Sequence, residues 1–189
     1  MKKSTLLFIS IFYTLCLFAQ IDDGLMKPNW KIGNSKTIYD NSITRIEGEN
    51  DIRGITNIGF KTFDQVKTNL LSKADKEMWT EEKKNETISS YEKFARGGII
   101  YMYITRLTID AANTEMFTLI IKDSTEKEIY REELESDIPN TPSSGSNYWW
   151  NYTSISLKET ISGKIYIYII DKLNSESGKF KFEINIPTK

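Results

Sequence analysis

The densest group of chemically useful side chains in this chain is aromatic: Tyr148, Trp149, Trp150, Asn151 and Tyr152. Flat rings beside polar groups suit stacking against the apolar faces of sugar rings. Successive side chains of a strand face opposite sides, so an extended segment separates Trp149 from Trp150. Two interpretations stay open: both rings are covered by core, helix or loop, or one faces outward and contacts a ligand or partner. These five residues are our predicted ligand-binding site.

Carboxylates are a second candidate for chemistry. Asp110, Asp123 and Asp171 follow apolar stretches, where sandwich loops gather oxygen ligands for calcium. No twelve-residue calcium loop with alternating acidic positions is present, so turn formation explains them better. We predict no metal site and no cofactor; calcium is the one cofactor these residues leave open, and nothing supports it.

A run of acids precedes a Pro/Ser/Gly-rich stretch at 139–147; it contains Glu132, Glu133, Glu135 and Asp137. A glycosidase needs two carboxylates held across a cleft, about 5–10 Å apart. Neighbours on one strand do not supply that geometry, so an acidic, solvated edge is expected. We nominate no catalytic residue.

The sequence lacks histidine and has one cysteine, Cys16. Nucleophile systems that depend on imidazole or a thiolate are therefore excluded once Cys16 is removed. Zinc and copper sites of the ordinary kind are excluded for the same reason. Carboxylate, lysine, tyrosine or a serine–lysine pair would have to carry any catalysis.

The elements that position these residues are mostly strands. Short strands are expected at 37–39, 43–46 and 52–60 within an irregular segment from 20 to 61, and apolar residues at steps of three and four predict an amphipathic helix at 63–79. The polar segment 80–98 predicts at most an edge strand at 87–94. Further strands are expected at 99–109, 116–122, 128–134, 148–157, 164–171 and 179–186.

Short strands with frequent turns and one helix predict a mainly β fold, an antiparallel β-sandwich or jelly roll. Along 179–186, apolar and polar residues alternate, as in a sheet with one solvated face. The strand at 164–171 is apolar or aromatic on both faces, as expected of a central strand. We find no repeat and no second boundary, so residues 20–189 are predicted to form one domain.

The first nineteen residues predict an export signal. Lys2 and Lys3 precede an apolar run at 6–18, and Ala19 offers a small residue before Gln20. The run is shorter than the roughly twenty residues of a membrane-spanning helix. We expect no lipid anchor at Cys16, because bulky leucines flank it instead of the small residue that usually precedes a lipidated cysteine.

The balance of charges limits the classes of partner that the protein is expected to bind. The chain has 25 basic and 26 acidic residues without a basic patch, which argues against nucleic acid. No later stretch predicts a membrane span. The leading hypothesis is an exported, non-catalytic module of the periplasm, cell surface or medium that binds a glycan or an envelope protein. The alternatives are a carboxylate-dependent glycan hydrolase and a purely structural or inhibitor-like envelope protein.

Overall fold

The computed structural model of the chain describes residues 30–174 and 178–187. The predicted export signal at 1–19, with Cys16, and the predicted new N-terminus at Gln20 lie outside these residues and stay predictions. Within the described residues, no helix is long and apolar enough to cross a membrane.

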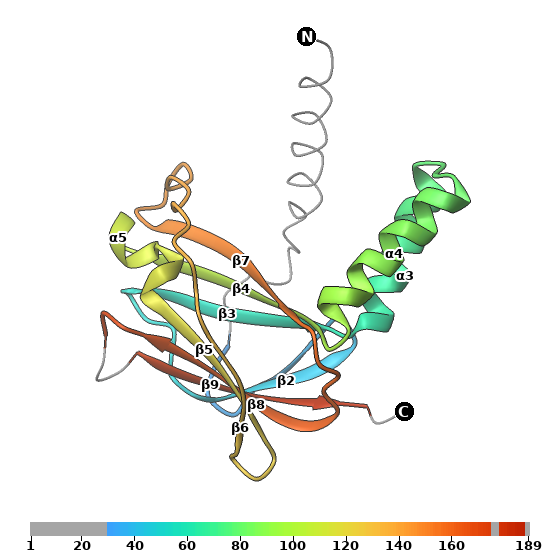
Figure 1. Cartoon of the computed structure of the whole chain (residues 1–189). Coiled ribbons are helices and arrows are strands. Elements are labelled where there is room, and N and C mark those ends of the chain that lie inside the picture. The colour runs from blue at the N-terminus through green and yellow to red at the C-terminus, as the bar shows by residue number, and fades with distance from the viewer. Residues whose placement is uncertain (1–29, 175–177, 188–189) are drawn as a thin grey trace.

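Nine strands and two long helices make up most of the described chain (Figure 1). The strands are β1 (Ser35–Ile38), β2 (Asn41–Glu47), β3 (Gly54–Lys61), β4 (Gly98–Arg106), β5 (Phe117–Asp123), β6 (Glu128–Glu133), β7 (Trp149–Leu157), β8 (Gly163–Asp171) and β9 (Lys179–Ile186). The helices are α3 (Phe63–Lys76), α4 (Glu81–Ala95), the short α5 (Ile109–Ala112) and the 3-10 turn η2 (Thr114–Met116).

The strands form two antiparallel sheets. The larger sheet has the order β1-β2-β9-β8-β5-β6, and the smaller has the order β3-β4-β7. Buried side chains of both sheets, such as Phe60 and Met102 from one and Leu119, Ile167 and Phe182 from the other, form a single apolar cluster between them. The predicted mainly β, sandwich-like fold is confirmed.

Individual strand patterns explain this packing. In β9 the buried residues are Phe180, Phe182, Ile184 and Ile186, so the predicted alternation is confirmed. β8 lies between β9 and β5, as its two apolar faces predict. The strands expected between residues 37 and 60 are also present, with shifted bounds.

The helical part differs from the sequence prediction, which expected a single helix where the described chain has two long ones, α3 and α4. The helix expected at 63–79 ends at Lys76, because Met78 adopts a left-handed φ of 51°. The predicted edge strand at 87–94 is wrong: these residues belong to α4. Thr80 caps that helix by accepting the Lys83 N–H, and Glu81 and Glu82 occupy its first turn, both of which favour a helix start.

Helices α3 and α4 form a hairpin that projects from one end of the smaller sheet (Figure 1). Val66 and Leu70 of α3 pack with Ala95 of α4 and Ile99 of β4 in a second buried apolar cluster. The partly buried Ile88, Tyr91 and Phe94 border this cluster. Their spacing puts them on one face of α4. The packing of this face against the second cluster stabilises the helix in an otherwise polar segment.

Candidate functional site

The predicted aromatic segment forms the start of β7, and strand alternation divides it between two faces. Trp149 pairs with Arg106 of β4, on the inner face that carries the buried Ile104. Trp150 and Tyr152 pair with Thr105 and Tyr103 and therefore share the outer face of the smaller sheet. Both tryptophans are half-buried. Neither is a fully buried core residue.

Rings from three parts of the chain meet on this outer face. Tyr101 and Tyr152 are stacked, with centroids 6.0 Å apart and planes inclined by 23°. Tyr39 lies 5.6 Å from Tyr101, and Tyr103 lies 6.3 Å from Trp150. We call Tyr39, Tyr101, Tyr103, Trp150 and Tyr152 the aromatic face. All are half-buried except Tyr103, which is 7% exposed.

Polar groups and loops border the aromatic face. The Lys61 ammonium lies 4.0 Å from the Tyr39 ring centroid and 5.5 Å from that of Tyr101. The α3–α4 hairpin rises at one end of the sheet and the loop before β7 at the other (Figure 1). Burial raises the pKa of the Tyr103 hydroxyl above its ordinary value.

Two of the five predicted site residues hold the chain in place. The Tyr148 hydroxyl donates to the Ile52 carbonyl at 2.7 Å. The Asn151 side chain is 1% exposed and donates to the Asp137 carbonyl at 2.8 Å. These bonds fasten the two ends of the 139–147 loop to the sandwich, so Tyr148 and Asn151 position the aromatic face from its border.

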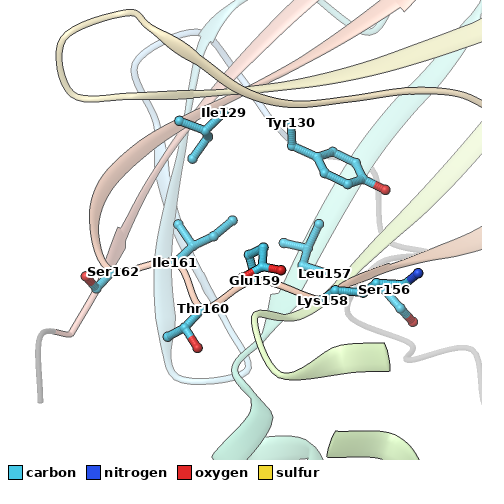
Figure 2. Close-up of a pocket in the computed structure, with 9 residues that line it drawn as sticks. All are labelled: Ile129, Tyr130, Ser156, Leu157, Lys158, Glu159, Thr160, Ile161 and Ser162. Atoms are coloured by element: carbon cyan, nitrogen blue, oxygen red, sulfur yellow. The ribbon is translucent and has the colours of Figure 1, made fainter. Parts of the chain in front are cut away.

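A pocket of about 630 Å³ lies between β6 and the end of β7 (Figure 2). Ile129 and Tyr130 of β6 lie on one side of it, with Leu157 and Ile161 opposite. The other lining residues are polar: Ser156, Lys158, Glu159, Thr160 and Ser162. Its volume lies within the range of small-molecule sites in proteins. No local sequence pattern reveals this pocket, because its residues come from segments that are far apart in the chain.

The pocket offers little acid–base chemistry. Glu159 is the single carboxylate among its lining residues, so the acid pair of a glycosidase is not present there. The Tyr130 hydroxyl donates to the Glu132 carboxylate at its border, and burial and this neighbour raise the tyrosine pKa. Gly97 packs against the Glu159 carbonyl so closely that a Cβ would overlap it, which fixes the wall formed by the β7–β8 loop.

A buried ion pair joins the two sheets near the opposite end of β7. Arg106 donates to Asp171 through Nε at 3.1 Å and Nη2 at 2.9 Å, and to the Thr56 hydroxyl at 2.9 Å. Asp171 also accepts the Leu173 N–H, so its predicted role in a turn is only part of its function. The adjoining cavity, beside Asp51 and Phe180, holds only about 20 Å³, room for about one water.

Arg45 is a second buried cation. Its side chain is fully buried, and it donates to the carbonyls of Trp30 and Thr56 at 2.9 and 2.7 Å. Its guanidinium lies 5.3 Å from the Phe182 ring and 5.8 Å from that of Phe180. Burial lowers the pKa of Arg45 to about 10. Backbone carbonyls and aromatic rings thus stabilise this charge inside the sandwich.

Of the two remaining candidate aspartates, Asp123 stabilises a turn. Asp123 accepts hydrogen bonds from Thr125 and from the Lys127 N–H in the β5–β6 turn. Asp110 lies in α5, before β5, while Asp123 ends that strand, so the two lie at opposite ends of β5. Within residues 30–174 and 178–187, no three acidic, histidine or cysteine residues are grouped to hold a metal ion.

Compared with known proteins, the chain matches no family model, no curated protein and no solved structure.

Proposed function

We propose that this protein is an exported, non-catalytic β-sandwich module that binds a glycan through its aromatic face. The observation that carries the proposal is the group of five rings on the outer side of the smaller sheet. Four of these rings are half-buried and have accessible surface, which matches the apolar faces of pyranose rings, because these stack on aromatic side chains. Lys61, beside Tyr39 and Tyr101, adds a cationic donor for a hydroxyl or an acidic sugar.

Binding is favoured over hydrolysis by where the acids lie. The pocket beside β6 has one carboxylate, and the cavity beside Arg106 is too small for a sugar. In that cavity, Asp171 is already paired with Arg106. A carboxylate-dependent hydrolase would need two acids facing a substrate-sized cleft. The geometry therefore supports recognition of a glycan better than its cleavage.

The test is a glycan array with the purified chain, followed by calorimetric titration of the glycans that bind. Trp150→Ala should weaken binding by about tenfold or more, equivalent to about 1.4 kcal/mol, because it removes one stacking ring. Its free energy of unfolding should fall by only about 1–2 kcal/mol, since the ring is half-buried.

The matched control is Tyr166→Ala. Tyr166 is also a half-buried ring, but it lies on the larger sheet beneath Lys181. This variant should keep the glycan affinity of the unmodified chain. Equal losses in both variants, or an array without any bound glycan, would reject the proposal.

A further inference from the structure

The pocket lies beside the outer edges of two strands. These two edges differ in how well they are protected against pairing with another chain. β6 and β7 each end their sheet, and residues of both line the pocket. Four of the six residues of β6 are charged: Glu128, Arg131, Glu132 and Glu133. Such charges prevent an edge strand from pairing with other chains. The nine residues of β7 include no charged residue, proline or glycine, so its edge lacks that protection.

The ladder shows which backbone groups of β7 point away from β4. Leu157 accepts the Gly97 N–H on the β4 side, while Trp150 exchanges two hydrogen bonds with Asn140 on the opposite side. The pairing with β4 has a constant register from Trp149 to Leu157. Because direction alternates along an antiparallel strand, Ser154 and Ser156 direct their N–H and C=O groups to the outer edge.

Only the first part of this edge is covered. The Asn140–Trp150 bridge and the bond from Asn151 to the Asp137 carbonyl close it where β7 begins. Within the described residues, no hydrogen bond engages the outward backbone groups of Ser154 or Ser156. Ser156 itself lines the pocket. The free backbone donors and acceptors of Ser154 and Ser156 therefore lie directly beside the partly apolar pocket.

We propose that an extended peptide segment of another protein binds here as an added strand on β7. Its backbone pairs with Ser154 and Ser156, and its inward side chains occupy the pocket among Ile129, Leu157 and Ile161 (Figure 2). Strand addition of this kind uses backbone bonds for affinity and side-chain pockets for selectivity. The segment is expected to carry apolar residues at alternate positions.

The occupant is a peptide segment and not a second copy joined through β7. The inward side chains of β7 near the open edge, Ile155 and Leu157, are 2% and 1% exposed. They are packed in the core of their own subunit and have no freedom to enter a neighbour's pocket. An unpaired, extended segment has side chains free on both faces and fills the cavity.

The experiment is selection of random peptides displayed on phage against the purified chain, followed by affinity measurements with synthetic copies of the enriched peptides. Ser154→Pro should weaken binding at least tenfold, because proline removes an outward N–H. The proline variant should keep the backbone hydrogen bonds between β7 and β4. An unchanged midpoint of denaturant unfolding would verify this. Ser154→Ala, which keeps the N–H, should bind as the unmodified chain does.

Two further measurements keep the test independent of the proline variant. Bound peptide should slow hydrogen exchange at the Ser154 and Ser156 amides of the unmodified chain. Ile129→Lys should weaken binding, since it adds a charge to the pocket wall at a side chain that is 44% exposed. Trp150→Ala should not weaken it, which separates this site from the aromatic face.

Several results would overturn the proposal. They are a selection without enriched peptides, enriched peptides that bind Ser154→Pro undiminished, and exchange protection confined to the β6 amides. A dimer that Ser154→Pro dissociates would assign the edge to a second copy instead.

Discussion

At the scale of single residues, Arg106 and Asp171 show how burial changes the contribution of an ion pair to the stability of the fold. Their side chains are 9% and 6% exposed, and they connect β4 to β8 across the two sheets. Burial lowers the pKa of Arg106, and the Asp171 charge opposes this shift. Each charge therefore depends on the other, because neither is adequately solvated alone.

Removal of one partner should be costly. Asp171→Ala is expected to lower the free energy of unfolding by about 3–5 kcal/mol, because it leaves the Arg106 guanidinium buried without its hydrogen-bonded counter-charge. Glu133→Ala breaks the exposed pair with Lys172, with a 3.1 Å contact, and should cost under about 1 kcal/mol. Denaturant unfolding of both variants is the measurement. Similar losses in the two would show that the buried pair has no special role.

At the scale of elements, the α3–α4 hairpin depends on its caps and on one apolar cluster. The Thr62 hydroxyl accepts the Gln65 N–H, and the Gln65 side chain accepts the Thr62 N–H, which forms a complete capping box. Gln65 also donates to the Tyr39 carbonyl, and it accepts from Asn41. The start of α3 is thereby connected to the loop that supplies Tyr39 to the aromatic face.

Thr62→Ala should destabilise the protein by about 1 kcal/mol, as loss of an N-cap does. Thr68→Ala is the control on the same helix: its hydroxyl donates to the Asp64 carbonyl one turn earlier, so its replacement should change little. Thermal unfolding followed by circular dichroism compares the two. A larger loss for Thr68→Ala would contradict the capping argument.

At the scale of the whole molecule, the hydrogen-bonded carboxylates on the surface predict that the protein loses stability at low pH. The pKa of Asp51 is lowered chiefly by its hydrogen bond from Arg53, that of Glu126 by Lys181, and that of Glu128 by Arg131. Hydrogen bonds from Thr125 lower the pKa of Asp123. For each, the folded pKa lies below the unfolded value. The resulting stability is present above the unfolded pKa and is lost as the pH falls through the folded one.

The free energy of unfolding should therefore be nearly constant from about pH 8 to 5 and fall below about pH 4, near the unfolded carboxyl values. The plateau follows because the chain has no histidine. Urea unfolding across this pH range is the measurement. Asp123→Asn should make the acid loss shallower, and a stability change centred near pH 6.5 would refute the argument.

The sequence by itself determined most of the strands and much of what they bury. Strong β patterns at β4, β5, β8 and β9 predicted these elements, because alternation or continuous apolar character follows directly from how a strand is buried. The absence of histidine likewise removes imidazole chemistry whatever the fold. Alternation also separates Trp149 from Trp150, because neighbouring side chains of an extended strand face opposite sides.

Only the tertiary structure decided what these elements bring together. α4 has few apolar residues, and its helix is supported by contacts with α3 and β4 that local pattern does not reveal. The aromatic face unites Tyr39, Tyr101 and Tyr152, which are far apart in sequence. The pocket between β6 and β7 exists because two different sheets end side by side. Strand pairing between distant segments sets these neighbours, and a single sequence does not specify that pairing.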